Sequence, residues 1–189
     1  MNMLNFFRTP KEKTSKTFTQ DFYQKSYHKW IENDQLVKRS FDLLLELIAN
    51  DQELNKRIEE QGPVAFIPAN GKMACSVRGE TDMRFVVVFP DLVQIMKSAS
   101  PTRAIAVLAH ELGHIFHNHH QRSQAGRKEK PLTTLEAQIE ADAFAARLGL
   151  AKELQDVLLE VEEDEGAFVE TRVRISQLTA YLLSDSQGH

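Results

Sequence analysis

The feature that most constrains the fold is an apolar stretch that runs into His110-Glu111-Leu112-Gly113-His114. All six residues from Ala104 to Ala109 are aliphatic and suit a buried helix. Apolar residues over this many turns predict a helix from Arg103 to about His120 that is buried on most of its surface. Such a helix is stable only when other elements pack around it.

Two histidines and a glutamate on this helix predict a metal centre. Residues four apart share one face of a helix, so His110 and His114 can bind the same ion. Glu111 lies beside them and can take a proton from a water molecule that the ion activates. The H-E-x-x-H spacing is typical of zinc sites that hydrolyse peptides.

Three more histidines follow the motif: His117, His119 and His120. His120 stands where another class of H-E-x-x-H enzyme places a third ligand, but His117 replaces the glycine that lets that chain turn. The simpler interpretation is a polar helix end, where the helix dipole favours cations.

The rest of the sequence predicts an α+β domain that is mostly helical and has one small sheet. We expect a flexible lead-in over residues 1–20 and a single domain over residues 21–189. Residues 64–67 and 73–77 flank a turn sequence and predict a β-hairpin, and residues 84–90 predict the clearest strand. Helical patterns cover the ranges 22–60, 91–98, 135–148 and 167–183.

Composition narrows the class of protein. The net charge of −4 over 189 residues gives no global attraction to nucleic acid. A single cysteine, Cys75, excludes a scaffold of intrachain disulfides and favours a reducing compartment. No apolar run approaches the ~18 residues of a membrane span. We therefore expect a soluble, cytoplasmic protein.

The chain resembles the gluzincin metallopeptidases, in particular the CAAX prenyl protease and HtpX-like family, with ImmA/IrrE-like peptidases as second choice. The resemblance implies a zincin-like fold, zinc as cofactor and a protein or peptide substrate. It also implies that the strand at Phe85–Phe89 is the sheet edge on which an extended substrate lies. The matching segments are 85–92, 104–114 with His119, 140–149 and, weakly, 174–178.

The sequence departs from this family at one position. The family's second-helix pattern, E-x-x-A-D, implies a glutamate as third zinc ligand and an aspartate that supports a ligand histidine. Asp142 matches the aspartate, but Gln138 stands at the ligand position. Helical phase supports this register, because it places Gln138 and Asp142 towards the interior and Glu136 and Glu140 towards solvent.

Three interpretations of the third ligand follow. Gln138 can bind through its amide oxygen, or the site can be completed by a residue from elsewhere, or the metal is bound poorly. The candidates from elsewhere are Glu140, Glu136, His120 and the acidic run 160–165. The sequence thus predicts a soluble zinc-dependent endopeptidase, and the alternative is a degenerate, peptidase-like binding or regulatory module with weak or no catalysis.

Overall fold

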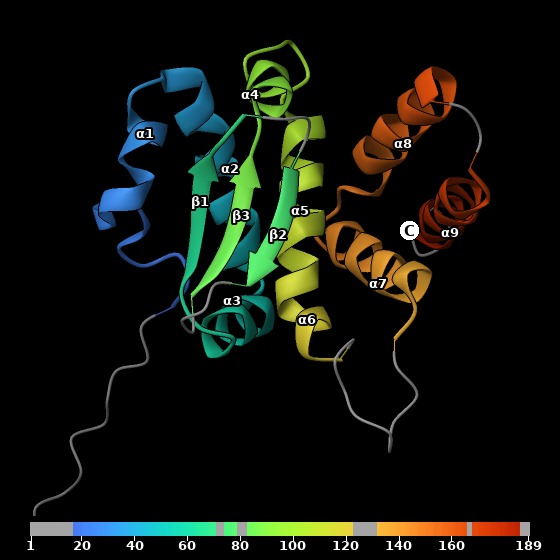
Figure 1. The fold of residues 1–189 in the computed structure, drawn as a ribbon, viewed down its shortest axis with the longest axis horizontal. Helices are drawn as coiled ribbons and strands as arrows, with labels where there is room; N and C mark the ends of the chain where they lie inside the picture. The colour runs from blue at the N-terminus through green and yellow to red at the C-terminus, as the bar shows by residue number, and fades with distance from the viewer. Residues whose placement is uncertain (1–16, 71–73, 79–82, 123–131, 166–167, 186–189) are drawn as a thin grey trace, which may run out of the picture.

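A computed structural model of the protein describes residues 17–70, 74–78, 83–122, 132–165 and 168–185 (Figure 1). Most of the lead-in expected over residues 1–20 lies outside these ranges. The described part begins with a turn in which Gln20 N–H donates to the carbonyl of Thr17. Phe18, within this turn, is buried in the hydrophobic core.

Helices dominate the described residues, and one small sheet accompanies them, which confirms the predicted α+β class. Among these residues, no helix combines the length and the apolar character needed to cross a membrane. In chain order the helical elements are η1 (Phe22–Gln24), η2 (Ser26–His28), α1 (Lys29–Glu32), α2 (Gln35–Asn50), α3 (Gln52–Glu60), α4 (Pro90–Met96), α5 (Thr102–Phe116), α6 (His119–Arg122), α7 (Thr134–Arg147), α8 (Ala151–Glu165) and α9 (Val169–Asp185).

The sheet has the strand order β1-β3-β2, formed by β1 (Val64–Pro68), β2 (Ala74–Arg78) and β3 (Arg84–Val88). β3 pairs with β1 in parallel and with β2 in antiparallel orientation. The predicted hairpin between the first two strands is therefore wrong, because β3 lies between them. β3 is also the central strand, so the expectation that it forms the sheet edge is wrong as well. Its side chains alternate between buried and half-buried, and two neighbours satisfy its backbone.

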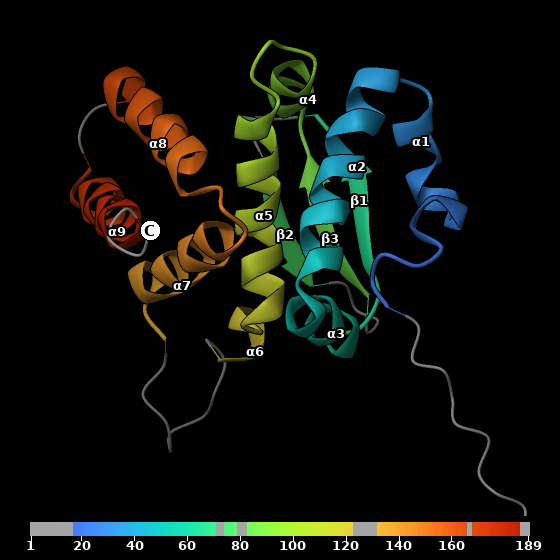
Figure 2. The ribbon, with the colours of Figure 1, turned by 180° about the vertical axis from the view of Figure 1, so that it is seen from behind.

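Helices α2 and α5 cover one face of the sheet, and α7, α8 and α9 lie on the far side of α5 (Figure 2). The core lies between these layers and includes side chains with no exposed surface, such as Phe41, Phe66 and Leu108. Local sequence fixes several helix starts. The Asp34 carboxylate accepts from the first-turn N–H groups of α2, and Asp51 does the same for α3.

The contact between α5 and α7 depends on Gly113, the glycine inside the H-E-x-x-H motif. A Cβ at this position would lie 2.8 Å from the Cα of Ala141 and 2.9 Å from the Cβ of Phe144. No residue larger than glycine fits there without moving the α7 backbone. The close approach brings the next residue of α7, Asp142, within reach of α5.

Helix α5 ends at Phe116, four residues earlier than predicted, so the prediction of a helix to His120 is wrong. The reason is Asn118, which has a φ of 54° in the left-handed region. Asparagine tolerates this conformation better than most residues, and one such residue ends a helix. The chain then reverses into α6, which begins at His119.

A buried histidine also links the N-terminal segment to the sheet. Phe66 N–H donates to His28 Nε2 at 3.1 Å, so His28 Nδ1 carries the proton and donates to the carbonyl of Phe22 at 2.9 Å. Burial lowers the pKa of His28 to about 4, although the bond to Phe22 opposes this shift. This histidine is therefore a neutral core residue.

Candidate metal centre

The two motif histidines face one another on α5. His110 Nε2 lies 3.2 Å from His114 Nε2. Two nitrogens bound at about 2.0–2.1 Å to one tetrahedral zinc ion are separated by about 3.3–3.4 Å. The spacing of the Nε2 atoms therefore fits two ligands of one zinc ion, and both rings turn their Nδ1 atoms away to other partners.

On the far side of His110, the Nδ1 atom lies 2.7 Å from Asp142 Oδ1. Asp142 is 1% exposed, and Arg174 on α9 binds its carboxylate with two contacts of 2.8 Å, from Nε to Oδ2 and from Nη2 to Oδ1. Burial alone would raise the pKa of Asp142, but Arg174 and His110 outweigh it and the pKa is lowered. Asp142 thus stays ionised and can orient the ring of His110.

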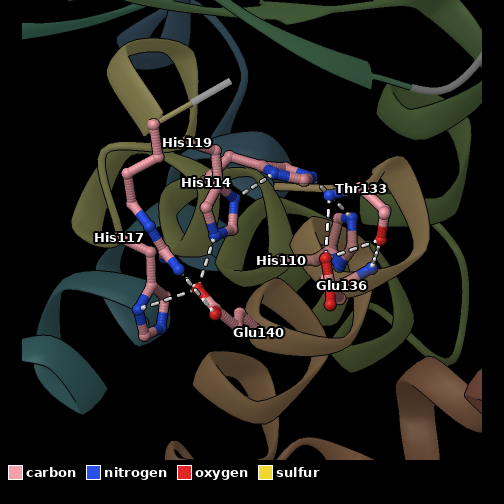
Figure 3. A network of polar contacts seen from close by, with 8 residues as sticks. His110, His114, His117, His119, Thr133, Glu136 and Glu140 are labelled. Atoms are coloured by element: carbon pink, nitrogen blue, oxygen red, sulfur yellow. Dashed lines mark hydrogen bonds and ion pairs between the residues drawn. The ribbon is translucent and has the colours of Figure 1, made fainter. Parts of the chain in front are cut away.

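On the far side of His114, the Nδ1 atom lies 2.7 Å from Nδ1 of His119. The other nitrogen of His119, Nε2, lies 3.0 Å from Glu140 Oε2. Arg122 binds both oxygens of Glu140, with 3.0 Å between Nη2 and Oε1. Figure 3 shows this network as a chain of side chains that runs from His110 through His114 and His119 to Glu140.

The electrostatics of the centre favour neutral imidazole and ionised carboxylate. Burial, followed by the neighbouring His110 and His119, lowers the pKa of His114 to about 3. The hydrogen bonds from Arg122 and His119 lower the pKa of Glu140 to about 2, against the effect of burial. A neutral imidazole keeps a lone pair, which is the form that binds a metal.

The remaining predicted site residues lie as follows. Glu111 is 8% exposed and follows His110 on α5. Gln138 is half-buried on α7 and lines a hollow that Arg174 also lines. Glu136 forms a capping box with Thr133 at the start of α7. The backbone N–H of Thr133 donates to Glu136 Oε2 at 2.9 Å. Glu140 was expected to face solvent, and the structure instead places it against His119 and Arg122.

A second group of metal-binding side chains lies next to this centre. Ligand atoms of His117, His119 and Glu140 all lie within 4.8 Å of one another. His117 Nδ1 is 3.7 Å from Glu140 Oε2, and its ring stacks on that of His119 with 5.4 Å between centroids. These residue types could hold an ion, although Arg122 already supplies the positive charge beside Glu140.

Sequence reasoning missed the roles of Arg174, Arg122 and His119. Arg174 stands in a segment of weak family resemblance, and nothing in that segment points to a carboxylate 32 residues away. His119 carried one signal, since it belongs to the matching motif five residues after His114. A buried aspartate without a cation nearby in the sequence is a further signal that an arginine or lysine must reach it.

Comparison with known proteins places this geometry in a family context. The model of peptidase family M48 matches residues 49–149, a little over half of the chain. The match covers the sheet, α5 and α7, and therefore His110, Glu111, His114 and Gln138. No curated protein and no solved structure matches the chain.

Proposed function

The chain belongs to peptidase family M48, and we propose that it is a zinc-dependent endopeptidase. In this proposal His110 and His114 bind the zinc ion and Glu111 is the general base. The observation that carries it is the pair of Nε2 atoms 3.2 Å apart, each on a ring whose Nδ1 contacts another side chain. Two lone pairs at this distance repel unless a cation or a proton lies between them.

The reaction class follows from the residues around this pair. Zinc supplies Lewis acidity, which polarises a peptide carbonyl and makes water acidic enough to lose a proton near neutral pH. Glu111 accepts the proton of the attacking water and can pass it to the amine of the leaving peptide. Asp142 and its partner Arg174 keep His110 in place during this transfer.

We propose Gln138 as the third ligand, through its amide oxygen. Gln138 lies four residues before Asp142 on α7, so both side chains project from one face of that helix. The two glutamates considered as replacements have other partners: Glu136 caps α7, and Glu140 lies behind His119. A neutral amide oxygen binds zinc more weakly than a carboxylate, and a site with this ligand loses metal more readily.

For the substrate we propose an extended protein or peptide segment that lies along β2. This strand is one edge of the sheet and packs beside α5, which carries the motif (Figure 1). Backbone groups at a sheet edge can pair with an added strand, independently of the sequence of that strand. A cytoplasmic location belongs to the same proposal, supported by the single cysteine.

The second candidate function is a peptidase-like module that binds without turnover, and Gln138 is the observation that favours it. Changing Gln138 separates the two. We expect Gln138→Glu to raise zinc affinity roughly tenfold or more, because a charged ligand replaces a neutral one. Gln138→Leu, which is similar in volume but has no ligand atom, is expected to lower it.

The test measures zinc affinity by competition with a chromogenic chelator, together with cleavage of an unfolded protein substrate, in wild type and both variants. Cleavage by wild type that a chelator abolishes and added zinc restores supports the endopeptidase. Zinc-dependent cleavage seen only in Gln138→Glu would establish the non-catalytic module instead. Unchanged zinc affinity in Gln138→Leu would remove Gln138 from the ligand set.

A further inference from the structure

We propose that His119, held by Glu140 and Arg122, is a positioning residue that fixes His114 in the tautomer with a free lone pair on Nε2. This inference rests on the proposed function, because it assigns a purpose to that lone pair as a zinc ligand. It adds a residue to the centre that binds neither the metal nor the substrate. The role follows from the direction of three successive contacts.

The contact between His119 and Glu140 determines which nitrogen of His119 carries the proton. Glu140 is paired with the guanidinium of Arg122 through both of its oxygens. A carboxylate in such a pair is ionised and can only accept hydrogen bonds. The 3.0 Å contact with His119 Nε2 therefore requires that His119 carries a proton on Nε2 and donates it to Glu140.

The contact between His119 and His114 determines which nitrogen of His114 carries the proton. A neutral imidazole with its proton on Nε2 has a lone pair on Nδ1 and accepts there. The 2.7 Å contact between the two Nδ1 atoms then requires His114 to donate from its own Nδ1. His114 is left with a lone pair on Nε2, the atom that faces His110 at 3.2 Å.

The fold brings the same helix, α7, behind both motif histidines. On α7, Asp142 contacts His110 directly, and Glu140, two residues earlier, reaches His114 through His119. Because the chain reverses at Asn118, His119 lies against the ring of His114. His119 is 5% exposed there. One carboxylate of α7 thus supports each histidine, and each carboxylate has its own arginine.

The same side chains could instead form a second metal site with His117, and two observations favour the positioning role. Arg122 binds the carboxylate that an ion would need. Moreover, an ion on His119 Nε2 would leave the His119 proton on Nδ1 and force His114 Nδ1 to accept. The proton of a neutral His114 would then lie on Nε2, which would remove it from the proposed zinc site.

The first experiment measures the zinc dissociation constant of the full-length chain. We expect His119→Ala to weaken zinc binding by about 10–100-fold, as is usual when the hydrogen-bond partner of a ligand histidine is removed. His119→Gln is the conservative variant, because its amide can accept from His114 and donate to Glu140. We expect it to restore most of the affinity. His117→Ala, which removes a neighbouring histidine without a contact to His114, is expected to stay within about threefold of wild type.

Two outcomes of this titration would overturn the positioning role. The first is evidence that His117, His119 and Glu140 form a metal site. Such evidence would be an equal loss of zinc affinity in His117→Ala and His119→Ala, or a second zinc ion per chain that both changes abolish. The second is a loss of zinc affinity in His119→Gln that is as large as in His119→Ala, while the thermal stability of the zinc-free proteins is unchanged. The hydrogen bonds that glutamine restores would then have no effect on zinc binding.

A second readout needs no metal and separates this inference from the proposed function. In zinc-free protein, long-range ¹H–¹⁵N correlation spectra report which ring nitrogen of His114 carries the proton. We expect the proton on Nδ1 in wild type and in His119→Gln, and a substantial Nε2–H population in His119→Ala. A wild-type His114 protonated on Nε2 would overturn the inference. Wild type with the expected tautomer but no zinc affinity would instead overturn the proposed function alone.

Discussion

Replacing Glu111 by glutamine is expected to lower the rate of peptide hydrolysis by a factor of about 10² to 10⁴, the range typical for loss of a general acid–base group. Glutamine has the shape of glutamate but does not accept a proton at neutral pH. Glu111 is buried beside His110, so the substitution keeps the packing of α5 while removing the proton acceptor. The measurement is kcat at saturating zinc and substrate.

The matched control is Glu46→Gln, which makes the same chemical change on an exposed position of α2. We expect this control to have wild-type kcat. Zinc affinity should be nearly unchanged in Glu111→Gln, because Glu111 is not a proposed ligand. Full activity in zinc-loaded Glu111→Gln would rule out Glu111 as the general base, even if the metal site is correct.

Replacing Arg174 by methionine is expected to lower the free energy of unfolding of the zinc-free protein at pH 7 by about 3–5 kcal/mol. Asp142 is 1% exposed, and Arg174 holds both of its oxygens at 2.8 Å. Without the guanidinium, the buried carboxylate keeps His110 as its one ionisable partner among the described residues. An uncompensated buried charge is among the largest destabilising changes known. Urea denaturation measures the difference.

The control is Arg172→Met on the same helix. Arg172 is 66% exposed and pairs with Glu162 at the surface, so its loss is expected to cost no more than about 1 kcal/mol. A second check is the double variant Arg174→Met/Asp142→Asn, which should recover part of the stability, because the charge is removed with its partner. Equal effects of the two arginine changes would show that Asp142 does not depend on Arg174.

The effect of Arg174→Met should also depend on pH. In wild type the pKa of Asp142 is lower in the folded than in the unfolded protein, where it is about 3.9. The ion pairs of Asp142 therefore stabilise the fold fully above the unfolded pKa, and this stabilisation is lost as the pH falls through the folded pKa. In the variant, burial is expected to outweigh the remaining contact with His110 and to raise the pKa of Asp142 above the unfolded value. Proton uptake then stabilises the folded state, and the stability deficit should shrink as pH falls from 7 towards 5.

The features that could be predicted from the sequence are those that depend on local periodicity. The helical conformation around His110 and His114 and the interior position of Asp142 follow from a repeat of 3.6 residues. The order of the strands does not. The turn sequence after β1 suggested a hairpin, but pairing is decided by which strands bury their faces under α2 and α5, and β3 takes the central place.

The partners behind the motif histidines could not be predicted because they are assembled over long distances in the chain. Arg174 reaches Asp142 from another helix. His119 reaches His114 only because Asn118 takes a left-handed conformation and ends α5. Periodicity alone predicted a continuous helix to His120, in which residues five apart lie about 140° apart and could not face one another. A single residue outside the helical region therefore created this part of the centre.

The most direct test of the account is the zinc content of the purified full-length chain and of its His110→Ala variant after dialysis against micromolar zinc. The proposed centre predicts close to one zinc ion per wild-type chain and a large loss in the variant, because one of the two facing Nε2 atoms is gone. Wild type without zinc, or equal zinc in both proteins, would contradict a metal centre built on His110 and His114.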